Sequence, residues 1–271
     1  MIQLNRFKDG KQHCLTFSYD DGGAADERLV KIFNRYGMKG TFHLNSGTLD
    51  TKNHIRSNQV YGLYRGHEVA CHSLTHPYPD RLPIAAWTQE IWQDRLKLEQ
   101  LSDSMIKGLS YPYGIYNSAV IAAAQSCGVV YSRTTKSTGK FMIPEDFMMW
   151  HPTCHHSTCM EYADKFFQPW GWNDEEQVFY DNRIFYVWGH SFEFERENNW
   201  SLIEEFCQRM SGNEKIWYAT NIEIYDYIQG LQRLQITADY KNVYNPSAMT
   251  LWFSYNGENV KIEGGEAVKL Y

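Results

Sequence analysis

The chain has 271 residues, a formal net charge of −6 and no clustered run of lysine and arginine. Nucleic-acid binding depends on such basic clusters, so we expect no nucleic-acid partner. No apolar stretch is long enough to cross a membrane, and the first residues lack the apolar core of a signal peptide, so we expect no membrane partner. The six cysteines follow no repeated spacing, which together with the missing signal predicts a cytoplasmic protein.

Short β-like runs alternate with helical patterns over most of the chain. The first run, residues 13–21, ends in two aspartates, and the helical pattern after it places Leu29, Ile32 and Phe33 on one face before Gly37. Further β-like runs lie at 40–45, 66–73, 106–114, 128–134, 183–190 and 215–220, and further helical patterns at 84–106, 117–127, 159–168, 199–211 and 221–234. Strands that alternate with helices favour parallel pairing, and about seven such units fit an α/β fold that closes, or nearly closes, into a barrel.

The pattern changes at residue 235. Residues 235–271 alternate apolar and polar side chains and carry turn signals at Asn245-Pro246, Asn256-Gly257 and Gly264-Gly265, without helical periodicity. We therefore divide the chain into a main domain, residues 1–234, and a small β-rich C-terminal extension, residues 235–271. Three roles stay open for the extension: it contacts sugar, it contacts a second subunit, or it covers an edge of the main domain.

Polar residues follow the ends of several predicted strands. Asp20 and Asp21 end the first strand, His72 and His76 follow the third, a Tyr-Pro-Tyr-Gly turn follows the fourth, and His190 ends a later one. In α/β folds the carboxyl ends of parallel strands meet at one edge of the sheet, where active sites form. We therefore expect these side chains to form one site.

The spacing of His72 and His76 is typical of two metal ligands. Side chains at i and i+4 share one face of a helix or helical turn, so both imidazoles can bind one ion. Asp21 is the candidate third ligand, and two histidines with one carboxylate leave a position open for water, as in catalytic zinc sites. Taken alone, Asp-Asp-Gly is also an ordinary turn, and a histidine is also a hydrogen-bonded structural residue. Their combination at strand ends favours a divalent metal site, with Zn²⁺ as the expected ion.

Four motifs of the chain resemble those of a known family. "TFSYDDGG" (16–23), "GHEVACHSLTHP" (66–77), "SYPYG" (110–114) and "VWGH" (187–190) are similar to the first, second, third and fifth motifs of polysaccharide deacetylases, the NodB homology domain of carbohydrate esterase family 4. The second motif carries the strongest resemblance. The resemblance implies a distorted (β/α)7-type barrel, with a metal held by Asp21, His72 and His76.

The resemblance also implies roles for three further residues. Asp20 matches the general base, His190 matches the general acid that protonates the leaving amine, and Tyr113 matches a residue whose backbone N–H holds the oxyanion. Elementary chemistry agrees with this set. Hydrolysis of an N-acetyl group needs an activated water, a carboxylate that takes its proton, a stabilised oxyanion and an acid of near-neutral pKa.

The chain departs from the family pattern in the third and fourth motifs. The arginine of the third motif, which in the family pairs with the base, is Ser110 here, and the loss of that cation predicts a less oriented Asp20 of higher pKa. Arg133, at the end of the next predicted strand, is either the replacement for this guanidinium or a surface arginine. The acid of the fourth motif has no clear counterpart; the candidates are Glu193, which is otherwise a solvated charge, and Asp146.

Aromatic and histidine side chains near the motifs each have two interpretations. Trp150 and Trp188 either line the pocket of the leaving group or belong to the core. His151, His155 and His156 either contact substrate or have a structural role. A metal role is disfavoured for these three histidines, because no carboxylate partner is evident in the sequence.

We therefore predict a metal-dependent hydrolase that removes N-acetyl or O-acetyl groups from a sugar or polysaccharide. Two alternatives stay open. One is a hydrolase of a non-sugar amide or cyclic ureide on the same fold, and the other is a carbohydrate-binding protein that has lost turnover. The retained Asp20 and His190 argue against a pure binder, because binding needs neither a base nor an acid.

Overall fold

The central sheet of the computed structural model, which describes residues 1–168 and 182–271, is built from parallel strands. Its strand order is β6-β5-β4-β3-β2-β8-β7, and β9 pairs with the first residues of β2. The strands are β2 (His13–Asp20), β3 (Gly40–Leu44), β4 (Glu68–Cys71), β5 (Gly108–Ser110), β6 (Tyr131–Arg133), β7 (Cys154–His155), β8 (Arg183–Gly189) and β9 (Ile216–Tyr218). Each predicted β-like run of the main domain contains one of these strands; the two-residue β7 is the one that the pattern does not predict.

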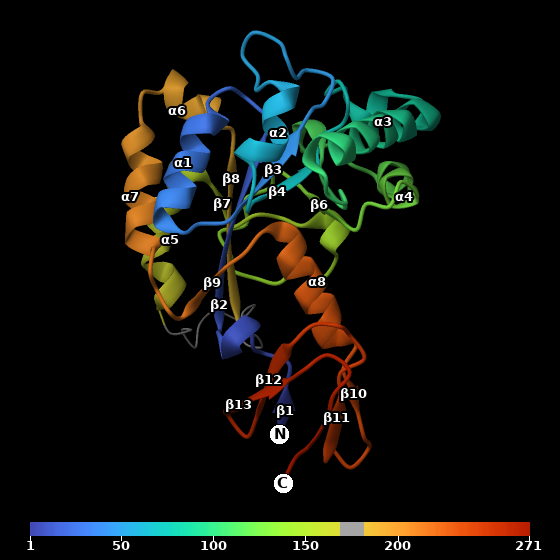
Figure 1. Ribbon diagram of the computed structural model, residues 1–271, viewed down its shortest axis with the longest axis vertical. Coiled ribbons are helices and arrows are strands. Elements are labelled where there is room, and N and C mark those ends of the chain that lie inside the picture. Colours follow the sequence, from blue (N-terminus) through green and yellow to red (C-terminus); the bar gives the residue numbers. More distant parts are fainter. Residues whose placement is uncertain (169–181) are drawn as a thin grey trace.

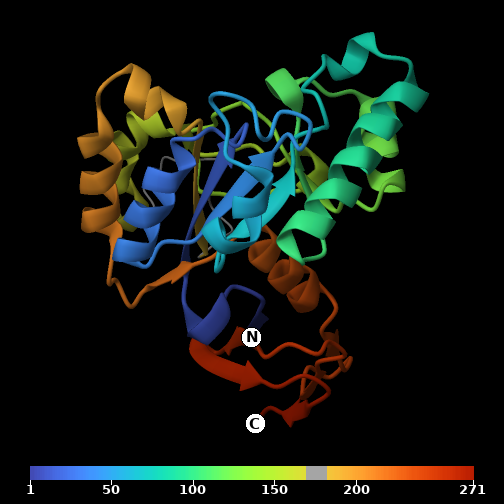
Figure 2. The same cartoon turned by 45° about the horizontal axis from the view of Figure 1, so that its top comes forward.

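The sheet curls into a half-barrel (Figure 2). One short segment, residues 150–155, pairs with both of its edges. Trp150 pairs in parallel with Arg133 at the end of β6, and a few residues later Cys154 and His155 form β7 beside β8. The expected α/β fold of the distorted barrel type is therefore confirmed. Parallel pairing places the carboxyl ends of β2, β4, β5, β6 and β8 along one rim.

Helices cover the outside of the sheet, with α1, α5 and α7 on one side and α3 and α4 on the other (Figure 1). The helices are α1 (Asp26–Tyr36), α2 (Val60–Leu63), α3 (Ile84–Ser102), α4 (Ser118–Ser126), α5 (Cys159–Ala163), α6 (Phe192–Arg196), α7 (Trp200–Met210) and α8 (Asn221–Gln232). Short 3-10 turns lie at Lys8–Gly10, Ser57–Gln59, Pro79–Arg81, Pro112–Gly114, Phe147–Met149, His156–Thr158 and Lys165–Phe167. Within the described ranges, no helix combines the length and the apolar character that a membrane span requires.

Helix α1 shows how local sequence determines an element. Leu29, Ile32 and Phe33 are buried as predicted, and the helix ends where Gly37 adopts a φ of 68°, a left-handed conformation that is easy for glycine. The ring of Phe33 packs on Phe17 of β2 with 4.6 Å between ring centroids. Trp150 is likewise buried, at 1% exposure, and packs on Tyr186, so it belongs to the core rather than to a pocket.

The extension forms two small antiparallel sheets at the end of the molecule where β2 begins (Figure 1). One contains β10 (Gln235–Ile236), β11 (Asn242–Tyr244) and β14 (Ala267–Lys269); the other contains β12 (Leu251–Tyr255), β13 (Glu258–Ile262) and β1 (Ile2–Gln3) from the N-terminus. Leu251 packs against α8, and Tyr227 of α8 accepts the backbone N–H of Trp252. Both termini thus lie away from the rim that carries the polar strand ends, and the boundary at residue 234 stays a prediction.

Glu68, at the start of β4, is a buried acid at the end of the sheet opposite to that rim. Its carboxylate accepts hydrogen bonds from the hydroxyls of Tyr131 (2.6 Å) and Thr41 (2.8 Å) and from the backbone N–H of Ile222 (2.9 Å). Burial outweighs these bonds and raises the pKa of Glu68 to about 7. The ordinary pKa of this carboxyl group is 4.5, so the unfolded chain releases the proton near that pH. The folded protein keeps the proton on Glu68 until the pH approaches 7.

We expect the Glu68→Gln variant to lose stability less steeply as the pH rises from 5 to 8. A folded-state pKa above the unfolded value stabilises the protein at low pH, and this contribution, about 3 kcal/mol at most, is lost as the pH rises through 7. Asp26 and Asp94 have pKa values raised in the same direction, so the slope should decrease rather than vanish. Urea unfolding at four pH values measures it, with Glu204→Gln on the exposed face of α7 as control; equal slopes for Glu68→Gln and wild type would contradict the prediction.

Candidate metal centre

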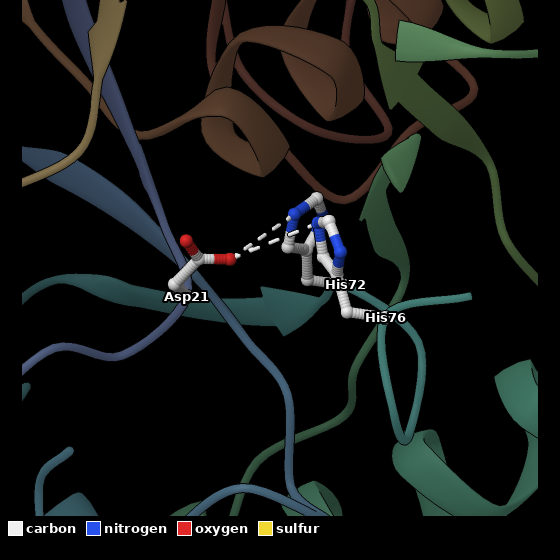
Figure 3. A group of neighbouring side chains, drawn as sticks. All are labelled: Asp21, His72 and His76. Carbon is white, nitrogen blue, oxygen red and sulfur yellow. Dashed lines mark ion pairs between the residues drawn. The ribbon is translucent and has the colours of Figure 1, made fainter. Parts of the chain in front are cut away.

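Asp21, His72 and His76 come together at the rim of the sheet (Figure 3). Asp21 follows β2, and one of its oxygens, Oδ1, lies 3.5 Å from Nε2 of His72 and 3.9 Å from Nε2 of His76. His72 follows β4 and is buried, whereas His76 keeps about a quarter of its side chain exposed. The three predicted ligands therefore point at one another.

The backbone between the two histidines is a loop, so the helical turn expected from their spacing is wrong. Ser73 and His76 have left-handed φ values of 67° and 58°, which reverse the chain and bring the two rings to 4.6 Å. Asn45 donates to the carbonyls of His72 and Ser73, and the buried carboxylate of Asp94 accepts the backbone N–H of His72 at 3.1 Å. These contacts, which the motifs do not predict, hold the loop in place.

The donor atoms fit a divalent ion. Ligands about 2.0–2.1 Å from a tetrahedral Zn²⁺ lie about 3.3–3.4 Å from one another, close to the separations of Asp21 Oδ1 from the two imidazoles. Nδ1 of His72 lies 2.9 Å from the carbonyl oxygen of Ser110 and 2.7 Å from its hydroxyl. A proton on Nδ1 satisfies that carbonyl and leaves the lone pair of Nε2 facing Asp21, which is the tautomer that a metal ligand needs.

Asp20 is buried beside this group and pairs with Arg133. Oδ2 of Asp20 lies 3.8 Å from Nε2 of His72 and accepts a hydrogen bond from Nη2 of Arg133, while Oδ1 accepts the hydroxyl of Ser110 at 3.1 Å. Burial by itself would raise the pKa of Asp20, but the guanidinium of Arg133 holds it well below its usual range. The higher pKa expected from the loss of the family's arginine is therefore wrong.

Arg133 is a fully buried residue, not a surface arginine. It donates to the hydroxyl of Ser18 at 2.9 Å and to the carbonyl of Thr134 at 3.1 Å, and Trp188 covers its guanidinium at 4.6 Å. Ser110 and Arg133 are register partners on the neighbouring strands β5 and β6. The guanidinium that pairs with Asp20 thus comes from β6, at the position in register with Ser110 on β5.

His190 lies near the second carboxylate oxygen of Asp21. Its Nε2 lies 3.9 Å from Oδ2 of Asp21, and its Nδ1 lies 3.4 Å from Oε2 of Glu193 in α6. Burial lowers the pKa of His190, but the carboxylates of Glu193, Asp20 and Asp21 outweigh it, so the pKa is raised overall. Asp146, the other candidate for an orienting acid, instead accepts the backbone N–H of Met148.

Tyr113 and Trp188 lie at the edge of the group. Tyr113 adopts a left-handed φ of 57°, and its half-exposed ring contacts His76 with 4.5 Å between centroids and stacks on Tyr78 at 3.9 Å. The backbone of Tyr113 therefore stands next to the histidine pair. Trp188 donates to the hydroxyl of Ser137 at 3.3 Å and is half-buried.

His155 and His156 have a carboxylate partner that the local sequence does not reveal. This partner is Glu193. Nε2 of His155 lies 3.0 Å and Nε2 of His156 lies 3.5 Å from Oε2 of Glu193. Burial lowers the pKa of His156 to about 3, so its ring is neutral at neutral pH. His151 lies apart from these two and contacts the hydroxyl of Thr134 at 2.6 Å.

Comparison with known proteins agrees with the motifs. The sequence model of the family described as "Polysaccharide deacetylase" matches residues 7–132. Residues 7–132, slightly less than half of the chain, thus resemble this family. The curated protein "Putative polysaccharide deacetylase YxkH" of Bacillus subtilis (strain 168) is 22% identical over 137 residues, which are 50% of this chain and 49% of that protein. The match thus spans about half the length of the curated relative.

Solved polysaccharide deacetylase structures share the fold. A "putative polysaccharide deacetylase from Mycobacterium smegmatis" aligns with a TM-score of 0.61 and 14% identity, covering 83% of this chain and 93% of that one. BA3943 of Bacillus anthracis, described as a pseudoenzyme of carbohydrate esterase family 4, aligns in a mutant form with restored enzymatic activity, with a TM-score of 0.50 and 15% identity over 81% of this chain and 69% of that one. At these identities the likeness concerns the fold alone.

Proposed function

We propose that this protein is a metal-dependent hydrolase of the polysaccharide deacetylase family that removes acetyl groups, N-linked or O-linked, from a sugar or polysaccharide. One observation carries the proposal. An ionised carboxylate, Asp20, and an imidazole, His190, lie beside the group formed by Asp21, His72 and His76, each within 4 Å of one of its members. A base and an acid beside one group of ligands can serve the two proton transfers of amide hydrolysis.

The chain's own residues divide these tasks. A Zn²⁺ held by Asp21, His72 and His76 supplies a Lewis acid and lowers the pKa of water. Asp20 accepts the proton of the attacking water, and its ion pair with Arg133 keeps the carboxylate oriented. His190 gives a proton to the leaving amine. Glu193 orients this residue, because its Oε2 accepts the backbone N–H of His190 at 3.1 Å and lies 3.4 Å from Nδ1 of the ring. We assign the backbone N–H of Tyr113 to the oxyanion, where a preorganised donor contributes most to such reactions.

The exposed aromatic rings at the rim support a carbohydrate as the substrate. Tyr78 and Tyr113 stack with an angle of 5° between their planes and expose 37% and 48% of their surfaces, directly beside His76. Flat aromatic surfaces of this kind pack against the apolar faces of sugar rings. Trp188, over Arg133, is the candidate wall of the leaving-group pocket.

Acetate release from a panel of substrates tests the proposal. Metal-loaded protein should release acetate from N-acetylated oligosaccharides or acetylated xylan fragments, and chelation should abolish the release until metal is restored. Asp20→Asn should lower turnover by about 10²–10⁴-fold because it removes the base, whereas Asp239→Asn in the extension should leave it unchanged. Release from small amides alone would favour the non-sugar hydrolase, and binding of oligosaccharide without any release would favour the binder.

A further inference from the structure

Three imidazole rings lie close to one carboxylate oxygen, Oε2 of Glu193. Around Oε2 lie Nε2 of His155 at 3.0 Å, Nδ1 of His190 at 3.4 Å and Nε2 of His156 at 3.5 Å. We propose that His155, His190 and Glu193 form a second divalent-cation site, selective for zinc-like ions, next to the first. His156 packs beside this group and is not counted among its three ligands.

Hydrogen bonding alone does not account for this arrangement. A carboxylate oxygen has two lone-pair positions, yet Oε2 also accepts the backbone N–H of His190 at 3.1 Å. Nδ1 of His190 is buried and makes no hydrogen bond of good geometry with any residue that the structure describes. Three ring nitrogens on an oxygen that is already occupied exceed its capacity as an acceptor, whereas a cation held by His155, His190 and Glu193 would give the nitrogens of both ligand histidines a partner.

The separations suit a metal. They lie between 3.0 and 3.5 Å, close to the spacing of about 3.3–3.4 Å between ligands of a tetrahedral Zn²⁺. The donor atoms of His155, His190 and Glu193 all lie within 4.8 Å of one another. Imidazole nitrogens with one carboxylate favour Zn²⁺ and neighbouring transition metals over Mg²⁺ and Ca²⁺, which prefer oxygen ligands.

Packing holds the donors in place and leaves a way in. His156 is 1% exposed, stacks on Phe194 at 4.1 Å, and lies against Gly189, where an added Cβ would come within 2.0 Å of its Nδ1. Residue 189 must therefore lack a side chain for this ring to sit where it does. His155 exposes about a quarter of its side chain, which gives an ion access from solvent.

The two sites share the ring of His190. Its Nε2 faces Asp21 of the first centre and its Nδ1 faces Glu193 of the second. An ion at Nδ1 takes the place of the proton that the ring needs to act as an acid. If His190 is the acid of the proposed function, occupancy of the second site should inhibit acetate release, so excess zinc should act as an inhibitor.

Calorimetric titration of the metal-free full chain with Zn²⁺ tests the second site. Wild type should bind two equivalents, Asp21→Ala should keep only the second, and His155→Gln should keep only the first. Glu193→Gln should match His155→Gln, which guards against a folding defect in either variant, and His151→Gln should keep both equivalents because His151 lies apart. One equivalent in wild type, with His155→Gln and Glu193→Gln binding like wild type, overturns the proposal.

Inhibition supplies a second measurement and separates the two proposals. His155→Gln should need at least tenfold more Zn²⁺ than wild type for half-inhibition of acetate release. Two equivalents without any acetate release from metal-loaded protein would uphold the second site and overturn the proposed function. Binding of one equivalent of Zn²⁺, with full acetate release that excess zinc does not inhibit, would uphold the proposed function and overturn the second site.

Discussion

Replacing Arg133 with methionine is expected to destabilise the protein by about 3–5 kcal/mol, because removing one partner of a buried ion pair leaves the other charge unpaired. Both partners are buried: Arg133 is 0% and Asp20 is 3% exposed. Acetate release should fall by about 100-fold or more, since the base loses the group that orients it. Urea unfolding measures the first effect, and turnover of folded protein at low temperature measures the second.

Two double variants show whether the effect comes from the ion pair. Arg133→Met with Asp20→Asn should recover much of the lost stability, since no unpaired charge remains, but should stay inactive. Ser110→Arg with Arg133→Ser moves the guanidinium to the register partner on β5 and should be clearly more active than Arg133→Ser alone. Arg35→Met, which breaks the exposed pair with Glu204, should cost no more than about 1 kcal/mol. A similar small cost for Arg133→Met would show that the buried pair contributes little.

His190→Ala is expected to slow hydrolysis of N-acetyl substrates by about 10²–10⁴-fold, the usual contribution of a general acid. An amine must be protonated as it leaves, whereas an activated phenolate leaves without a proton. Turnover of an aryl acetate by the same variant should therefore fall less than tenfold. His151→Gln is the matched histidine control and should retain activity on both substrates. Equal losses on amide and aryl ester would assign His190 a structural role instead of an acidic one.

The strand ends of this chain were predictable from local patterns. Alternating β-like and helical runs locate β2, β4 and β8, and the residues that end or follow them, Asp20, Asp21, His72, His76 and His190, are of types that bind metals or transfer protons. Parallel strands bring their carboxyl ends to one rim, so a list of strand ends is already a prediction of a site. The loop between His72 and His76 was misjudged because two left-handed residues, not a helical turn, bring the rings together.

The sequence by itself determined which residues stand at the rim, and only the tertiary structure decided how they pair. Arg133 reaches Asp20 across 113 residues because the curled sheet brings β6 across from β2, although β5, β4 and β3 lie between them in strand order. Glu193 meets His155 across 38 residues because β7 pairs with β8, and α6 follows β8 directly. Hydrophobic periodicity and turn residues are patterns that extend over a few residues, so they predict the secondary structure of one element at a time. Which elements become neighbours, and which side chains can then share a charge or a proton, follows from the packing of the whole sheet.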